Sequence, residues 1–283
     1  MSNITVQLID GMNFKEAIPG IVHVFRDDEV VPWHRQDECL EWIARRTERG
    51  FYITVACDGD TIVGYSEWIE TYDDGRKLLY LGIMQVDCDL RSRGIGKVML
   101  DDGEKYAINI GASHLRTIPE DERSHNFYRK YGFYDTDTIS HFACHTSGSG
   151  VQCGEPITVT LEIVNTHEFV FGLGQSSGRH MFECANHHPE SSGYTAITMN
   201  IPDGYLQFRH KKGTKNAEAL YWSNNAPTVQ AIANILVLGR EAGFDEVGFS
   251  FRTKYKSLFT DFPIITKEDM DEDEIELERS VAL

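Results

Sequence analysis

A short loop in the first half of the chain combines positive charge and glycine at a spacing that suits an anion. It reads Arg91-Ser-Arg-Gly-Ile-Gly96 and lies between a strand-like run that ends at Val86 and a helical stretch at 97–110. At such a junction the free N–H groups of the helix start point to one place with the helix dipole behind them. Gly94 and Gly96 let a ligand approach the backbone closely. The pattern predicts an anion site better suited to a pyrophosphate than to a carboxylate. Taken alone, it also fits an ordinary tight turn with solvated cations.

The segments around this loop predict a mixed α/β domain. Asp58-Gly59 between two alternating runs is typical of a hairpin, and Gly111 is typical of a helix end. In chain order we expect strands at 4–9, 51–57, 61–70, 78–86 and 114–118, and helices at 35–49, 97–110 and around 127–131.

Two linked motifs give this domain a family resemblance. The stretch at 81–133 contains VDCDLRSRGIGKVML and, farther on, DERSHNFYRKYGF. It resembles the GNAT superfamily of acyl-CoA-dependent N-acetyltransferases, in which the R/Q-x-x-G-x-G/A loop holds the coenzyme A pyrophosphate. In that family the later segment is the helix beside the thioester. The resemblance covers residues 1–145 in element order and implies a GNAT-like acetyltransferase fold.

The resemblance also implies roles for individual residues. Tyr128 falls at the family's tyrosine and would act as general acid toward the departing coenzyme thiolate. The alternative interpretation is that Tyr128 is an aromatic residue of the core, because it lies at helical spacing with Phe127 and Tyr131. Coenzyme binding is implied for Met84, Gln85, Val86, Arg91, Ser92, Arg93, Gly94, Ile95, Gly96, Lys97 and Asp121. The cofactor is acetyl-CoA as co-substrate, and no metal is expected.

The sequence departs from the family pattern at several positions. Asp121 stands where many members have asparagine, and Ser124 replaces the usual alanine. Gly82 and Ile83 occupy strand sites where a glutamate often serves as base, and Arg116 occupies the alternative site. The motif therefore assigns no general base.

A base or a water chain is nevertheless expected. An amine with a pKa of about 10.4 is only about one part in a thousand neutral at pH 7, which corresponds to roughly 4–5 kcal/mol. The candidates are Glu67, Glu70, Asp87 and His34, each of which also fits a solvated surface group. The other possibility is an acceptor whose amine has a low pKa.

In the resembled family a loop borders the acceptor site. Carboxylates beside an aromatic residue in this loop would suit a cationic amine, and the residues concerned are Asp27, Asp28, Glu29, Trp33 and His34. A polar loop with one packed tryptophan fits the same residues.

Composition bounds the class of protein. The length of 283 residues favours two domains, and 27 Lys plus Arg against 44 Asp plus Glu give a net charge of −17, which argues against nucleic-acid binding. Eight carboxylates at 267–279 predict a solvated acidic tail. The N-terminus has no basic stretch followed by an apolar core, and no apolar run is long enough for a membrane-spanning helix. A cytoplasmic protein without membrane contact is therefore expected. The six cysteines lack a CxxC pair and are interpreted as reduced and mostly buried.

The second half repeats the element order of the first. We expect strands at 194–201, 205–210, 219–222 and 247–251, with helices at 227–242 and 255–262. The steps from Gly96 to Leu115 and from Thr228 to Val247 both span 19 positions. Alignment of the last helices places Phe259 with Tyr128, and no glycine occurs at 219–238 to form an anion loop. This half is interpreted as a degenerate GNAT-like repeat that does not bind coenzyme A. An anion site at Arg179 and His180 and a metal site at Cys184, His187 and His188 are weaker alternatives.

The prediction is therefore a tandem protein. It has a catalytic acetyl-CoA-binding domain at 1–145, a linker at 146–154, a second domain at 155–266 and an acidic tail at 267–283. The expected activity is N-acetyltransfer from acetyl-CoA to a small-molecule or peptide amine by direct attack, in a monomer or homodimer. The alternative is a non-catalytic acyl-CoA-binding sensor or scaffold.

Overall fold

The computed structural model describes residues 4–9, 14–27, 35–73, 75–146, 168–172, 194–201, 204–265 and 274–281. The first half contains β1 (Ile4–Leu8), α1 (Phe14–Val24), α2 (Gln36–Glu48), β2 (Tyr52–Asp58), β3 (Thr61–Asp73), β4 (Arg76–Val86), η1 (Cys88–Leu90), α3 (Ile95–Ile110), β5 (His114–Thr117), α4 (Glu122–Lys130) and β6 (Tyr134–His145).

The second half continues with β7 (Glu168–Phe171), β8 (Tyr194–Ile201), β9 (Gly204–Lys211), β10 (Asn216–Ser223), α7 (Val229–Glu241), β11 (Glu246–Arg252), η2 (Thr253–Phe259), β12 (Ile264–Ile265) and β13 (Glu274–Ser280). The strands of both halves join in one 13-stranded sheet of order β1-β2-β3-β4-β5-β13-β6-β11-β10-β9-β8. In addition, β12 pairs with β6 and β7 with β10. The mixed α/β fold predicted from the sequence is confirmed.

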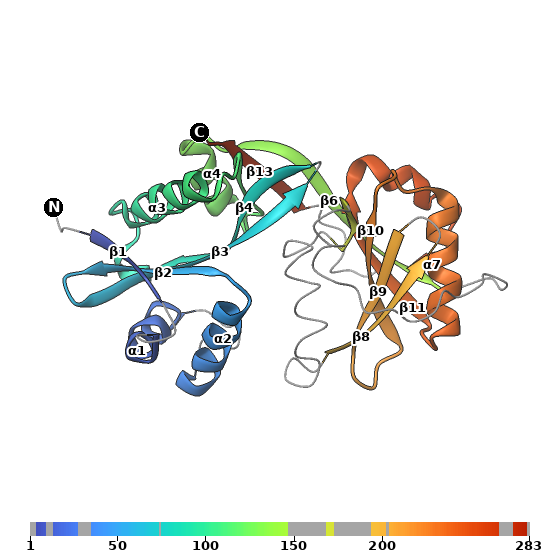
Figure 1. Cartoon of the computed structure of the whole chain (residues 1–283), viewed down its shortest axis with the longest axis horizontal. Coiled ribbons are helices and arrows are strands. Elements are labelled where there is room, and N and C mark those ends of the chain that lie inside the picture. Colours follow the sequence, from blue (N-terminus) through green and yellow to red (C-terminus); the bar gives the residue numbers. More distant parts are fainter. Residues whose placement is uncertain are drawn as a thin grey trace.

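The first half is a sheet with helices on both faces. In Figure 1, α3 and α4 lie on one face, and α1 and α2 lie on the other. Strands β1 to β4 are antiparallel neighbours, whereas β4 and β5 are parallel and connected through α3. The hairpin turn takes its positive φ at Gly59, and α3 ends at Gly111 in the left-handed region, with φ of 72°. Both turns agree with the sequence prediction.

The second half builds a comparable layer on the other end of the sheet. Strands β8, β9 and β10 are antiparallel, α7 follows, and β11 returns parallel to β10. Its aromatic-rich core includes Phe208, Phe249 and Phe259. The short helix expected at 255–262 is the 3-10 helix η2, which spans Thr253–Phe259. The predicted linker lies mostly outside the described residues, as do Arg179, His180, Cys184, His187 and His188.

The interpretation of the C-terminal acidic run as a solvated tail is wrong for its described part. Residues 274–280 form strand β13, which lies between β5 and β6 in the sheet. Glu276 and Glu278 are buried, and Leu277 is fully buried in the core under α3 and α4. The physical reason is that arginines from distant strands supply the positive charge that these carboxylates need inside the protein: Arg76, Arg116 and Arg252.

The two halves exchange their last strands. β13 from the second half pairs antiparallel with β5 of the first half, and β6 from the first half pairs antiparallel with β11 of the second. β13 and β6 also pair with each other, so the order β5-β13-β6-β11 alternates between the halves. Figure 1 shows β6 as the long strand that runs from one half to the other. Each half therefore completes the sheet of its neighbour.

Two further observations concern membrane-spanning helices and the cysteines. No helix in the described ranges is long and apolar enough to cross a membrane. Cys39, Cys57 and Cys144 are buried free thiols, and Cys88 is a half-buried one. Burial raises the pKa of Cys39 to about 12, which makes this thiol unreactive at neutral pH.

Truncation of Leu277 tests whether β13 is integral to the first half. We expect Leu277→Ala to lower the free energy of unfolding by about 2–5 kcal/mol, because it opens a cavity in the core shared with Leu115 and Tyr128. Ile275→Ala, on the same strand at a side chain that is 37% exposed, is the matched control and should have a small effect. Chemical denaturation measures both. Equal stabilities of Leu277→Ala and the wild type would show that β13 is dispensable.

Candidate functional site

The backbone of β4 has a free edge next to the predicted anion loop. β4 pairs with β3 along its whole length but with β5 only from Leu78 to Tyr80. A register shift between Glu67 and Trp68 places Gly82 as an extra residue in β4. Beyond it, no strand in the described part of the chain pairs with residues 82–86 on the side away from β3. We call residues 82–86 the free edge. Apart from the carbonyl of Val86, which accepts a hydrogen bond from Arg91, the N–H and C=O groups on this side are available to an extended ligand.

The residues expected to contact the pantetheine arm lie on this free edge. Met84 and Val86 direct their side chains to the apolar clusters beside α3. Gln85 is half-buried, and its Oε1 atom lies 3.5 Å from Nη2 of Arg91. Backbone groups rather than side chains are therefore what this segment offers to a ligand.

The loop after the free edge has the backbone conformation of an anion nest. Ser92 and Gly94 both have positive φ, at 67° and 86°. Gly94 is the N-cap of α3, and a Cβ atom there would meet nothing within 4 Å, so the space in front of the loop is open. The N–H groups of the first helical turn face this space without helical partners. The geometry fits a phosphate or pyrophosphate group.

Ile95 and Gly96 have packing roles as well. Ile95 is buried with Met99 in the core beside β4. A Cβ atom at Gly96 would lie 2.9 Å from Cζ of Phe127, so only glycine lets α3 and α4 approach this closely. The second glycine of the motif thereby fixes the position of the helix that carries Tyr128.

The three cations of the loop are in different situations. Arg91 donates from Nε to the carbonyl oxygen of Val86 at 3.3 Å and so ties the loop to the end of β4. Lys97 pairs with Asp101 one turn along α3, and this partner raises the pKa of the lysine. The side chain of Arg93 is exposed. All three remain close to the nest formed by Ser92 and Gly94.

Tyr128 lies at the opposite end of the free edge. Its side chain is only 6% exposed and packs against Phe127 and Phe133, with ring centroids 5.3 Å away in both cases. It shares a hydrogen bond with Thr117, and the Thr117 hydroxyl donates to the carbonyl oxygen of Leu81 at 3.2 Å. Burial raises the pKa of Tyr128, and the hydrogen bond with Thr117 partly opposes this effect. The phenol is therefore protonated at neutral pH.

Asp121 is used as the N-cap of α4. Its Oδ1 atom accepts from the backbone N–H of Ser124 at 2.6 Å, and the hydroxyl of Ser124 lies 3.0 Å from the backbone nitrogen of Asp121. These hydrogen bonds lower the pKa of Asp121. The two departures from the family pattern, Asp121 and Ser124, together form a capping box that fixes the helix of Tyr128.

The described candidates for the base have structural partners. Glu67 is buried and accepts from Nε1 of Trp42 at 2.7 Å and from the hydroxyl of Tyr65 at 2.5 Å. Glu70 pairs with Lys77 at 3.0 Å. His34 lies outside the described residues, as do Asp28, Glu29 and Trp33.

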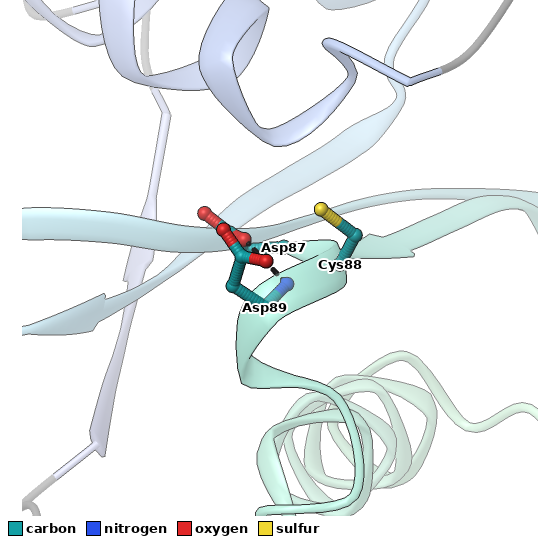
Figure 2. A group of neighbouring side chains, drawn as sticks. All are labelled: Asp87, Cys88 and Asp89. Atoms are coloured by element: carbon teal, nitrogen blue, oxygen red, sulfur yellow. Dashed lines mark hydrogen bonds between the residues drawn. The ribbon is translucent and has the colours of Figure 1, made fainter.

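Asp87 belongs to a cluster that closes the start of the loop. Figure 2 shows Asp87, Cys88 and Asp89 gathered at η1. Nη2 of Arg26, from the end of α1, lies 2.9 Å from Asp87, 2.8 Å from Sγ of Cys88 and 2.7 Å from Asp89. The hydrogen bond from Arg26 lowers the pKa of Asp87. The guanidinium thus supplies the positive charge of this cluster and ties α1 to the loop, while Asp27 stays exposed beside it.

A second polar site, which no sequence motif predicts, lies between the halves. A buried charge cluster lies there and comprises Asp73, Arg76, Arg116, Asp137, Arg252, Glu276 and Glu278. Asp73 is its centre, with Arg116 and Arg252 each 2.5 Å away. A cavity of about 320 Å³ opens beside the cluster. Its members are far apart in the sequence, so no local pattern predicts it.

Comparison with known proteins identifies the first half. Residues 18–133 match the family model described as Acetyltransferase (GNAT) family. These residues are a GNAT acetyltransferase domain. The matched stretch contains the free edge, the nest at Ser92 and Gly94, and Tyr128. No curated protein sequence matches the chain significantly.

Solved structures extend the likeness in fold to both halves. A GCN5-related N-acetyltransferase from Kribbella flavida is 14% identical, with a TM-score of 0.64 over 98% of this chain and 71% of that one. One from Anabaena variabilis is 11% identical, with a TM-score of 0.65 over 99% and 73%. A probable N-acyltransferase from Enterococcus faecalis is 13% identical, with a TM-score of 0.59 over 99% and 72%. At these identities the likeness concerns the fold alone.

Proposed function

We propose that the chain is an N-acetyltransferase that transfers the acetyl group of acetyl-CoA to the amine of an acceptor by direct attack. The observation that carries this proposal is the free edge of β4, with an anion nest at one end and a buried, protonated tyrosine at the other. A linear thioester coenzyme with a pyrophosphate has its polar groups in the same order. No covalent intermediate on the protein is required.

Coenzyme binding would use backbone groups first. The nest at Ser92 and Gly94 would receive the pyrophosphate, with Arg91, Arg93 and Lys97 adding positive charge in an acidic domain. The free edge, with Met84, Gln85 and Val86, would pair with the pantetheine amides as an added strand does. Ile95, Gly96 and Asp121 would act through packing and capping that hold the two helices in place.

Tyr128 would supply the proton that the leaving thiolate needs. As the amine nitrogen attacks the carbonyl carbon, a C–N bond forms and the C–S bond breaks. The raised pKa of Tyr128 keeps its proton available at neutral pH, and a coenzyme thiolate is a far better base than water. A backbone N–H near Gln85 would polarise the carbonyl oxygen.

A non-catalytic acyl-CoA sensor or scaffold is the alternative, and the engaged carboxylates Glu67, Glu70 and Asp87 favour it. The two functions differ in turnover. Thiol release from acetyl-CoA in the presence of simple amines, polyamines, aminoglycosides or peptides supports the acetyltransferase. Binding of acetyl-CoA without thiol release supports the sensor.

We also propose that the second half is a degenerate copy, joined to the first near residues 146–154, that does not bind coenzyme. β10 pairs with β11 only up to Glu218, and the rest of its edge is taken by β7, whose Phe171 and Phe169 lie opposite Tyr221 and Trp222. Phe259, at the position equivalent to Tyr128, stacks on Phe251 with centroids 4.4 Å apart. A strand of the chain itself thus fills the place of the pantetheine arm.

Removal of the Tyr128 hydroxyl group tests whether this residue is the general acid. We expect Tyr128→Phe to lower kcat by about 100-fold or more, because the thiolate must leave without a proton. The affinity for acetyl-CoA should stay close to that of the wild type. Tyr131→Phe, one turn along and half-buried, is the matched control and should keep its turnover. Unchanged kcat in Tyr128→Phe would refute this role.

A side chain in the nest tests coenzyme binding. Gly94→Glu is expected to abolish acetyl-CoA binding in calorimetry, because it places a bulky anion where the pyrophosphate would lie. Gly111→Glu is the matched control: it lies at the other end of α3, also has positive φ and also faces open space. If Gly94→Glu binds as Gly111→Glu does, the nest is not the coenzyme site.

A further inference from the structure

The carboxylate Glu276 lies at the level where the free edge begins. Tyr80 on β4 is opposite Arg116 on β5, which is opposite Glu278 on β13. The next residues in these strands are Leu81, Thr117 and Leu277, and the Thr117 hydroxyl reaches the carbonyl oxygen of Leu81. Glu276 is one residue farther along β13. It is therefore level with Gly82, where β4 and β5 separate.

Glu276 also lies on the face of the sheet opposite Tyr128's helix. Leu115 and Leu277 pack under α3 and α4, and successive side chains of a strand point to opposite faces. Arg116, Glu276 and Glu278 therefore point to the face that α1 and α2 cover elsewhere in the first half. An acceptor entering from that face would meet the thioester from the side opposite α4.

Tyr80 connects this face with the catalytic side. Its ring is buried in the core under α1 and α2. Burial raises the pKa of Tyr80, the charges of Glu276 and Glu274 raise it further, Arg116 opposes them, and Tyr128 adds a smaller increase. The strand register likewise places Tyr80 two residues before Gly82, the residue level with Glu276.

The surroundings of Glu276 distinguish it from the other carboxylates of the cluster. Its Oε1 atom lies 3.5 Å from Nε of Arg116 and 3.3 Å from the hydroxyl of Thr136. Burial raises its pKa even though Arg116 and Arg252 act against the shift. In Glu278 the charges of Arg116 and Arg76 outweigh burial and lower the pKa, and in Asp73 those of Arg116 and Arg252 do the same. The charged groups that face Glu276 are Arg116, Arg252, Asp73 and Glu278.

The cavity beside the cluster gives Glu276 access to a small molecule. Its volume is about 320 Å³, and its lining includes Glu276, Arg116, Thr136 and Asp137. Its outer part contains the exposed side chains of Tyr134 and Lys254. A volume of this size is within the range of ligand sites.

We propose that the acceptor amine enters through this cavity and that Glu276 accepts its proton, so that the second half supplies the base that the GNAT motif of the first half lacks. This inference rests on the proposed acetyltransferase function. The ammonium gives one proton to the Glu276 carboxylate, and the freed lone pair attacks the thioester carbon. The C–S bond breaks and the thiolate takes the proton of Tyr128. The amide nitrogen then releases a second proton, which restores Tyr128 through solvent, and Glu276 gives up its own proton to solvent.

The pH dependence of kcat/KM with an amine acceptor tests this role. In the wild type, kcat/KM rises with pH as Glu276 loses its proton and then accepts one from the amine. Glu276→Gln is expected to lower kcat/KM by about 100-fold at neutral pH and to move this limb up to the pKa of the amine, because only the small neutral fraction of the acceptor then reacts. Glu276→Asp should restore part of the rate and keep a limb. Glu274→Gln, the same change two residues earlier on β13, should keep both the rate and the limb.

Each result has one interpretation. A limb that stays at its wild-type pH in Glu276→Gln, or an equal loss in Glu274→Gln, overturns the assignment of Glu276 while the acetyltransferase activity stands. A wild type that releases no thiol with any amine overturns both proposals. If Glu276→Gln fails to fold by circular dichroism, the limb in Glu276→Asp decides, because an unshifted limb there refutes the role.

Discussion

Backbone pairing across the order β5-β13-β6-β11 is the constraint on which the rest of the structure depends. Each half ends in a strand that hydrogen-bonds between strands of the other half, so neither sheet is complete alone. This exchange brings charged side chains of six strands together in the buried charge cluster. Buried ions are tolerated only when they are paired. Asp73 meets this requirement through Arg116 and Arg252, one from each half.

The same rule of backbone pairing accounts for the difference between the halves. Parallel strands that separate leave an edge whose polar groups need partners. In the second half, β7 provides them along β10, and aromatic side chains fill the space around Phe259. In the first half the free edge of β4 remains available beside the nest at Ser92 and Gly94. If the second half is a copy of the first, as proposed, the same architecture has one edge covered and the other open.

Local sequence patterns predicted the parts of the fold that depend on local physics. Asp58-Gly59 and Gly111 mark turns whose positive φ only a few residues tolerate, and the spacing from Arg91 to Gly96 already indicates the nest. β13 was missed because a run of carboxylates normally stays solvated. Its counter-ions, Arg116 and Arg252, come from strands that no sequence window connects to it. The capping role of Asp121 had a local signal in Ser124, three residues later, as in a capping box.

Hydrogen–deuterium exchange of the full chain with and without acetyl-CoA is the most direct test of the account. In the proposed complex, the coenzyme pairs with the free edge of β4 and with the nest that follows it. We predict that acetyl-CoA slows amide exchange in residues 82–97 and leaves residues 219–223 of the second half unchanged. Unaltered exchange at 82–97, or protection at 219–223, would contradict the account.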